Sequence, residues 1–189
     1  MRIGKVIIVP AALLLMIFAA LAQDPNASHY EKDGLSFDYP ANWQLADKST
    51  PQMQFLELTK DDVVIRLRSP REALKTPDKE AHAKKIFQDQ YVSSFFDSFQ
   101  QQGMQPKRSP VTTQIGGGDA DGVRIRVVNG GETGGVDSYD RVISERLVHL
   151  SIIGSDKEIA RDAPAWDQIR GSVKIAAPAA NASPSPKKP

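Results

Sequence analysis

The pattern of apolar and polar residues alternates with a period of two early in the chain. Leu35, Phe37 and Tyr39 alternate with polar residues, which is typical of a strand with one buried face. The segments 53–59 and 63–68 continue the alternation on either side of a short polar connection that fits a hairpin turn. We therefore predict that the folded region begins with short strands.

The pattern then changes to the period of an α-helix. Thr76 is a good N-cap in front of Pro77, and the segment that follows contains no Gly or further Pro until Gly103. Four aromatic residues in this segment recur every four positions: Phe87, Tyr91, Phe95 and Phe99. This spacing predicts an amphipathic helix of about seven turns that ends at a glycine C-cap. An aromatic stripe on one long helix is more often a face that packs on a sheet than a ligand surface.

Alternation returns after this helix. We expect four more strands, with a turn through 144–146 between the last two: about 104–115, 122–128, 136–143 and 147–153. Ser155 and Glu158 form the S-x-x-E pattern of a capping box, which predicts a short helix. Pro164 breaks or restarts that helix, and a last strand is expected at 172–175.

The start of the chain has the three-part pattern of a secretory signal peptide, residues 1–22. Basic residues precede an apolar run, and Ala20 and Ala22 place small side chains at the −3 and −1 positions of a cleavage site after Ala22. We expect cleavage there and a periplasmic or secreted protein. The alternative is an inner-membrane anchor formed by residues 6–22, a run that is short for a membrane-spanning helix.

Composition divides the rest of the chain into three parts. Residues 23–33 are expected to be a flexible N-terminal segment, residues 34–176 one domain, and residues 177–189 a disordered tail of Pro, Ala, Ser and Lys. The tail has no large apolar side chain, so it cannot bury enough surface to offset its ordering entropy. The domain that remains has the ordinary size for a single core.

The absence of cysteine from the 189 residues excludes disulfides, thiolate metal sites and thiol nucleophiles. Charge is balanced as well, with 24 Lys and Arg against 23 Asp and Glu. No basic stripe with interleaved aromatic residues occurs, so nucleic acid is not an expected partner. We expect a monomer that contacts a membrane only through an uncleaved signal segment.

The densest glycine cluster, IGGGDADG at 115–122, fits none of the common glycine-rich ligand loops. No Gly-Lys-Ser/Thr occurs, which excludes a P-loop. A dinucleotide fingerprint that starts at Gly116 would need glycine where Asp121 stands, and an EF-hand loop aligned on Gly122 lacks two essential ligands. A tight turn between antiparallel strands needs only the positive φ that glycine adopts readily, so we predict a structural turn.

Histidine is the remaining source of catalytic chemistry. His29 falls in the flexible segment and His82 in the charged first turn of the long helix, so only His149 lies within an expected strand. A hydrolase could combine it with an Asp and one of three serines: Ser138, Ser144 or Ser151. No G-x-S-x-G elbow or H-E-x-x-H motif supports such a site. A strand histidine between Val148 and Leu150 is more often a partly exposed residue of a sheet face.

Two short motifs resemble the two ends of a known domain. The segment from Gly34 to Trp43, GLSFDYPANW, resembles the opening G-[FL]-[ST]-[FI]-x-[YV]-P-x-x-W of PsbP-like and DcrB-like domains. The segment from Ile169 to Val173, IRGSV, resembles their ending, a helix followed by a short strand. The resemblance implies an α+β fold, namely an α/β/α sandwich with a central antiparallel sheet, one long helix and a short C-terminal helix.

The same resemblance implies a non-enzymatic role, because domains of this fold act mainly as accessory, docking or chaperone-like modules. It transfers no catalytic residues, no cofactor and no metal ligands. We expect an exported binding module that contacts a protein partner in the cell envelope, or a small ligand, through a surface that includes Trp43, Tyr139 and His149. The alternative is a periplasmic hydrolase or ligand-binding enzyme that uses His149 with a nearby Ser and Asp.

Overall fold

The computed structural model describes residues 26–177, and the largest element in them is a seven-stranded antiparallel sheet. In spatial order its strands are β3 (Gln44–Asp47), β4 (Met53–Lys60), β5 (Val63–Pro70), β9 (Arg146–Ser155), β8 (Glu132–Ile143), β7 (Gly118–Asn129) and β6 (Lys107–Ile115). A smaller antiparallel sheet contains β1 (Ala27–Lys32), β2 (Leu35–Pro40) and β10 (Lys174–Ile175). The helices are α1 (Pro77–Gln101), α2 (Asp156–Arg161) and α3 (Ala163–Ser172).

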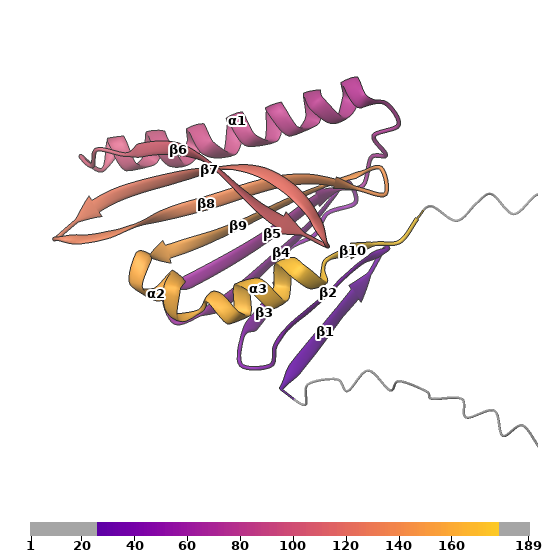
Figure 1. Cartoon of the computed structure of the whole chain (residues 1–189), viewed down its shortest axis with the longest axis horizontal. Helices are drawn as coiled ribbons and strands as arrows, with labels where there is room; N and C mark the ends of the chain where they lie inside the picture. Colours follow the sequence, from indigo (N-terminus) through magenta and orange to yellow (C-terminus); the bar gives the residue numbers. More distant parts are fainter. Residues whose placement is uncertain (1–25, 178–189) are drawn as a thin grey trace, which may run out of the picture.

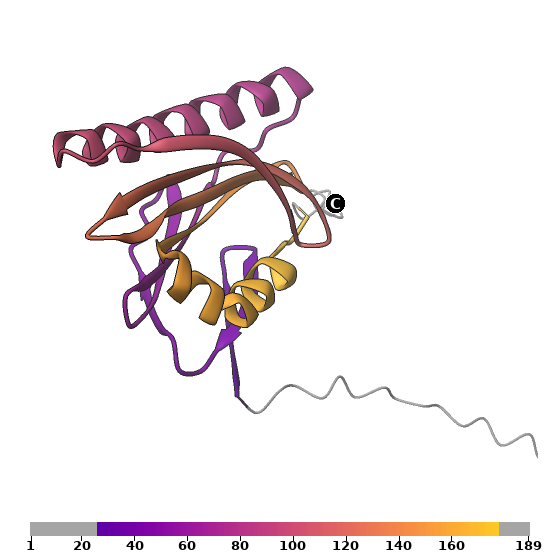
Figure 2. The same ribbon diagram turned by 60° about the vertical axis from the view of Figure 1, so that its left-hand side comes forward.

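Helices cover the large sheet from both sides. Figure 1 shows α1 along one face, while α2, α3 and the small sheet lie at the other face. The view in Figure 2 shows the same three layers from the side. This arrangement confirms the predicted α+β fold with a central antiparallel sheet, one long helix and short helices near the C-terminal end.

Helix α1 begins and ends close to where the sequence predicts. The Thr76 hydroxyl accepts a hydrogen bond from the Lys79 amide, and Pro77 occupies the first turn, where its missing N–H costs nothing. Gly103, just after the helix, has a φ of 78°. A residue with a Cβ atom would be strained at this φ, which explains why glycine occupies the position where the chain leaves the helix.

The aromatic side of α1 packs on the large sheet, as its spacing predicts. Tyr91 and Val92 are buried there together with Ile125 of β7 and Val136 of β8. Three further aromatic side chains lie partly buried around this cluster: Phe95, Phe96 and Phe99. The helix is therefore held to the sheet mainly by its central and C-terminal turns.

The main hydrophobic core lies on the opposite face, between the large sheet, α3 and β2. Its members include Leu56, Leu58, Ile65, Leu67, Leu150, Ile152, Trp166 and Ile169. Leu35 and Phe37 of β2 complete it from the small sheet. Each large apolar side chain that is fully buried contributes about 1.5–3 kcal/mol, so this core stabilises the fold more than the smaller cluster under α1.

Two of the predicted hairpin turns show how the chain adopts a positive φ with and without glycine. Strands β6 and β7 meet at Gly116 and Gly117, whose φ angles are 55° and 79°, so the glycine cluster is the structural turn that was predicted. The predicted turn between β8 and β9 is also confirmed, but there Ser144 and Glu145 adopt φ angles of 47° and 64° without glycine. The Ser144 hydroxyl donates a hydrogen bond of 3.1 Å to the Ile175 carbonyl, which offsets part of the strain.

The segment 23–33 was expected to be flexible, and for residues 26–33, the part that the structure describes, this is wrong. Residues 27–32 form β1, which pairs with β2, and the ring of Tyr30 stacks on Phe37 with centroids 5.3 Å apart. The strand is polar on its outer face, so alternation alone did not reveal it. The signal that could have revealed it is Asp33-Gly34, whose positive φ angles make the hairpin turn between β1 and β2.

Two other boundaries also differ from the prediction. Asp119 and Asp121 were expected in a turn but lie in β7, because the turn uses only the two glycines before them. The last strand begins at Lys174, since Ser172 still belongs to α3 and its hydroxyl accepts a hydrogen bond from the Asp38 amide. The chain therefore reaches the small sheet two residues later than expected.

The predicted signal peptide at 1–22, its cleavage site, the alternative anchor at 6–22 and residues 178–189 of the tail lie outside the described residues. Within residues 26–177, no helix is long and apolar enough to cross a membrane.

Candidate binding groove beside helix α1

Helix α1 covers only part of the sheet face on which it lies. It contacts β7, β8 and β9, whereas β3, β4 and β5 continue the sheet beyond the helix (Figure 2). The side chains of β4 and β5 on this face are half-buried, among them Phe55, Arg66 and Arg68. The long side of α1 and this uncovered half of the sheet therefore form the two walls of a groove.

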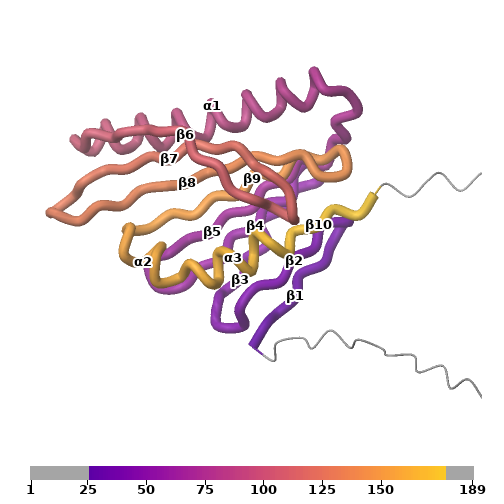
Figure 3. Tube along the Cα trace, viewed as in Figure 1, coloured from indigo at the N-terminus to yellow at the C-terminus, as the bar shows by residue number. Residues whose placement is uncertain are grey.

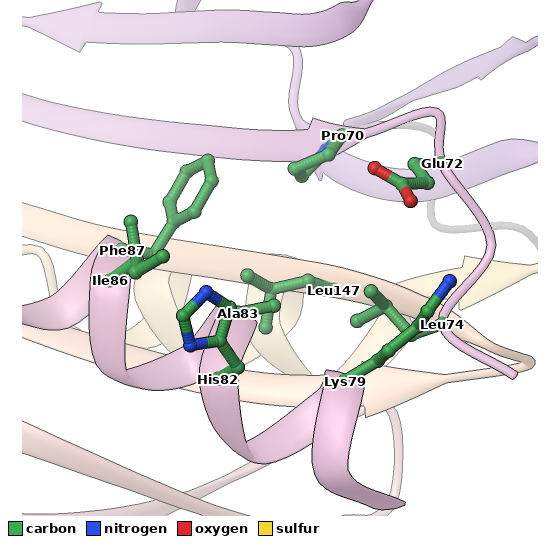
Figure 4. A pocket seen from close by; sticks show the side chains of 9 residues that line it. All are labelled: Pro70, Glu72, Leu74, Lys79, His82, Ala83, Ile86, Phe87 and Leu147. Carbon is green, nitrogen blue, oxygen red and sulfur yellow. The ribbon is translucent and has the colours of Figure 1, made fainter. Parts of the chain in front are cut away.

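The N-terminal half of the groove is an apolar hollow of about 350 Å³. Its lining residues come from α1, from the segment between β5 and α1, and from the start of β9: Pro70, Glu72, Leu74, Lys79, His82, Ala83, Ile86, Phe87 and Leu147 (Figure 4). Ile86 is 37% exposed, and in residues 26–177 only Val128 is another large apolar side chain that is exposed. Exposed Ile86 beside buried Leu74 gives this hollow an apolar wall open to solvent.

A second hollow, of about 340 Å³, continues the groove along the helix. Its lining residues are Met53, Phe55, Arg68, Phe87, Gln90, Tyr91 and Ser94. Phe87 lines both hollows, so we treat them together as the α1 groove. Arg68 lies between two rings, with its guanidinium carbon 4.6 Å from the centroid of Phe55 and 4.7 Å from that of Tyr91.

The charged side chains in and beside the second hollow differ in whether they have an oppositely charged partner. The carboxylate of Glu57 accepts from Lys48 Nζ at 2.6 Å and from Arg66 Nε at 2.9 Å, and the hydrogen bond from Lys48 is the main reason that the pKa of Glu57 is lowered. Arg68 has no hydrogen bond or ion pair to any side chain in residues 26–177. Burial lowers the pKa of Arg68, with the neighbouring Arg66 as a lesser cause.

A row of buried polar groups lies beneath α1 on strands β8 and β9. The Nδ1 atom of His149 is 2.8 Å from Oδ1 of Asp140, and His149 has no exposed surface. The Tyr91 hydroxyl is 2.8 Å from the hydroxyl of Ser151. Phe87 and Tyr91 cover the imidazole of His149, and their ring centroids are 5.9 and 4.5 Å from that of the imidazole. Within the described residues, Nε2 of His149 and Oδ2 of Asp140 are buried and lack a hydrogen-bond partner.

The three residues expected on one binding surface lie apart and are buried. Trp43 and Tyr139 belong to the main core on the α3 face, where Tyr139 contacts Trp166 with centroids 6.0 Å apart. His149 lies on the α1 face, and its expected partial exposure is corrected to complete burial because α1 crosses over it. The structure therefore does not bring these three side chains together.

None of the three serines considered for a triad forms a hydrogen bond with the imidazole of His149. Ser151 pairs with Tyr91, Ser138 donates towards the Val123 carbonyl, and Ser144 is in the β8–β9 turn. An oriented Asp–His pair is present, but none of these hydroxyls is its hydrogen-bond partner. In residues 26–177, no group of three or more His, Asp or Glu side chains is placed to hold a metal ion.

The residue that sequence reasoning missed is Arg68. The alternation in β5 places Arg66 and Arg68 on the face opposite the core residues, but it gives no sign of what they contact there. The site around Arg68 is built from Phe55 of β4 and Tyr91 of α1, which lie far apart in the sequence. No local pattern could have shown that contact.

Comparison with known proteins adds information on the fold. No protein-family model matches the sequence, and no similar curated protein is found. The structure is similar to the solution structure of cyanobacterial PsbP (CyanoP) from Synechocystis sp. PCC 6803, with a TM-score of 0.51 and 13% identity, over 82% of this chain and 95% of that chain. The fold is PsbP-like.

The PsbP-like fold implied by the two terminal motifs is thereby confirmed. A Pseudomonas aeruginosa protein of unknown function, PA94, matches with a TM-score of 0.35 and 14% identity over 76% of this chain and 92% of that chain. A shared fold at such low identity fixes the architecture only. The function has to be argued from the groove itself.

Proposed function

We propose that this protein is an exported, non-enzymatic accessory module that binds a protein partner in the α1 groove. The observation that carries the proposal is the exposed apolar wall at Ile86, in a hollow that the fold leaves open beside its longest helix. Apolar concave surfaces with a few charged groups at the rim are typical of binding sites. The PsbP-like fold supports a binding role by analogy, since the resemblance implies accessory functions.

The occupant that best fits the groove is an extended segment of a partner protein with a bulky apolar side chain. The first hollow can take one such side chain between Ile86 and Leu74, and its volume of about 350 Å³ is at the lower end for ligand pockets. The first hollow is lined by one carboxylate, Glu72, and one ammonium group, Lys79, so it is Arg68 in the second hollow that favours an acidic residue close to the apolar one. The proposed partner segment is therefore apolar and acidic.

Site-specific photocrosslinking in the native host tests this function. A photoreactive residue in place of exposed His82, at the rim of the groove, is expected to capture one recurring protein. The matched control places the same residue at Asp167 on α3, whose side chain is 59% exposed on the opposite side of the sheet. The expected result is capture from position 82 and not from position 167.

The second half of the test combines the crosslinker at position 82 with the substitution Ile86→Glu. A negative charge on the apolar wall should abolish capture, whereas Asp167→Asn should leave it unchanged. Capture that is equal from both positions, or that survives Ile86→Glu, would assign the partner to another surface. The fold of each variant is checked by its far-UV circular dichroism spectrum.

A hydrolase that uses His149 is the second candidate, favoured by one observation. Asp140 orients the imidazole as the acid orients the base in a catalytic triad. Against it, His149 is fully buried and its second nitrogen has no nucleophile beside it among the described residues. Hydrolysis of a panel of p-nitrophenyl esters by the wild-type protein, abolished by His149→Gln, would favour this candidate over the binding module.

A further inference from the structure

Arg68 is the one cation in the second hollow that the protein itself does not neutralise. Lys48 and Arg66 share the carboxylate of Glu57, whereas the guanidinium of Arg68 contacts only aromatic rings and is not bonded to any carboxylate in the described part of the chain. Half-burying an arginine without a carboxylate carries a desolvation cost, and the lowered pKa of Arg68 reflects that burial. A bound anion would remove this cost.

We infer that Arg68 is the specificity-determining residue of the α1 groove and binds a carboxylate of the partner segment. This inference rests on the proposed function and names the chemistry that the groove recognises. The guanidinium carbon lies over the rings of both Phe55 and Tyr91, and neither ring uses the N–H groups as a carboxylate acceptor would, so these groups remain for an acceptor. A carboxylate matches them with two parallel hydrogen bonds.

The balance of charge selects a carboxylate over a phosphate. Arg68 is the only charged residue among those that line the second hollow, and the neighbouring cations Lys48 and Arg66 are already bonded to Glu57. A single free guanidinium compensates one negative charge, whereas a phosphate group carries nearly two at neutral pH. Asp89 on α1 is engaged by Lys85 and is not a competitor for Arg68.

Phe87 determines the distance between the two recognised groups. It lines both hollows, so a ligand that fills the apolar hollow and reaches Arg68 must pass this ring. Successive side chains of an extended peptide point to opposite sides, so two side chains that enter the same groove come from residues two apart. The expected recognition element is therefore an apolar residue and an acidic residue with one residue between them.

The test is an NMR titration of the full chain, purified from its own host, with two probe peptides. Acetyl-Phe-Gly-Asp-amide carries the carboxylate, and acetyl-Phe-Gly-Asn-amide is its neutral isostere. The acidic probe is expected to bind about tenfold more tightly, because a hydrogen bond to a charged group is that much stronger than to a neutral one. The Nε–H signal of Arg68 should shift with the acidic probe only.

Two substitutions separate the role of Arg68 from that of positive charge in general. Arg68→Gln should remove the preference and leave binding of the neutral probe unchanged, while Arg68→Lys should retain part of it. Arg161→Gln is the control for loss of a positive charge, since Arg161 belongs to α2 at the other face of the sheet and pairs with Asp162, and it should leave the preference intact. A preference that survives Arg68→Gln, or displacement of the acidic probe by equimolar inorganic phosphate, would overturn the inference.

The outcome is distinguishable from failure of the proposed function. Binding of the acidic probe that depends on Arg68, without capture of a protein from position 82, would support the carboxylate site and assign it to a small ligand. Capture that depends on Ile86 but is unchanged by Arg68→Gln would leave the binding module standing and refute the role of Arg68.

Discussion

His149 and Asp140 form a buried pair across neighbouring strands, with Nδ1 and Oδ1 2.8 Å apart. The two residues face each other in the register of β8 and β9, so the sheet itself fixes their contact. Helix α1 seals the pair from solvent through Phe87 and Tyr91. Each partner retains one buried polar atom without a hydrogen bond among the described residues. Burying these two atoms lowers the stability of the folded state, which opposes the gain from the hydrogen bond.

Replacing one member of this pair should lower the free energy of unfolding more than replacing both members by apolar residues. Asp140→Ala leaves a buried imidazole without its only partner and is expected to lower the free energy of unfolding by about 3 kcal/mol. The double variant Asp140→Leu with His149→Phe replaces the pair by apolar side chains and should remain within about 1 kcal/mol of wild type. Urea unfolding followed by circular dichroism measures both, and equal losses would contradict the argument.

The bond between Tyr91 and Ser151 anchors α1 to β9. Tyr91→Phe deletes one hydroxyl and leaves the other buried without a partner, so it should cost about 1–2 kcal/mol of stability. Ser151→Ala should cost a similar amount. If the hydrogen bond is the cause, the double variant costs less than the sum of the single ones, and purely additive losses would argue for packing instead.

The stability of the protein should fall in acid because of Asp137. Burial raises the pKa of its carboxyl, but hydrogen bonds from Arg124 and Arg126 outweigh burial and hold the pKa below its ordinary value. The folded state therefore binds the proton less readily than the unfolded chain, whose Asp pKa is about 3.9. The stabilisation is present above that pH and is lost as the pH falls through the lower, folded-state pKa.

The substitution Asp137→Asn tests that pH dependence. Wild type should lose stability between about pH 5 and pH 2, and the variant should lose less over the same range. Other carboxyl groups with lowered pKa values keep the variant from becoming independent of pH: Asp47, Glu57 and Asp162. The midpoints of urea unfolding, measured for both proteins across this pH range, test the prediction. If the midpoints of wild type and variant fall by the same amount, Asp137 does not cause the loss of stability.

The two glycines of the β6–β7 turn should respond differently to alanine. Both have a positive φ, which costs an alanine about 1–2 kcal/mol. A Cβ on Gly116 would also lie 2.4 Å from the Val173 carbonyl oxygen, while one on Gly117 would meet nothing within 4 Å. Gly116→Ala should therefore destabilise the protein by about 1–3 kcal/mol more than Gly117→Ala, as thermal unfolding can show; equal effects would mean that the backbone angle alone matters.

Features set by neighbouring residues were the ones that the sequence could predict. The limits of α1 follow from Thr76, Pro77 and Gly103, and the short helix α2 follows from the capping box of Ser155 and Glu158, in which both hydrogen bonds are present. Hairpins follow from alternation around short polar or glycine turns. These signals act within a few residues and do not depend on the rest of the fold.

The candidate site could not be predicted in this way because it depends on how the helix lies on the sheet. His149 was identified as the only histidine in an expected strand, but its burial depends on where α1 crosses the sheet, and Tyr91 of α1 lies far from His149 in the sequence. Arg68 differs from other strand arginines in its contacts with the rings of Phe55 and Tyr91, which come from two separate elements. Long-range placement of this kind is a property of packing, and no periodicity reports it.

The pairing of β10 with β2 has a consequence for the order in which the chain folds. Lys174 pairs with Ser36, so the small sheet joins the two ends of the described chain, as the tube in Figure 3 makes visible. A nascent chain that has not yet left the ribosome lacks β10 and the α3 residues that close the main core. Contacts of such high sequence separation form slowly. The main core therefore stays open until α3 and β10 have been made, and the domain closes only at the end of that sequence of events.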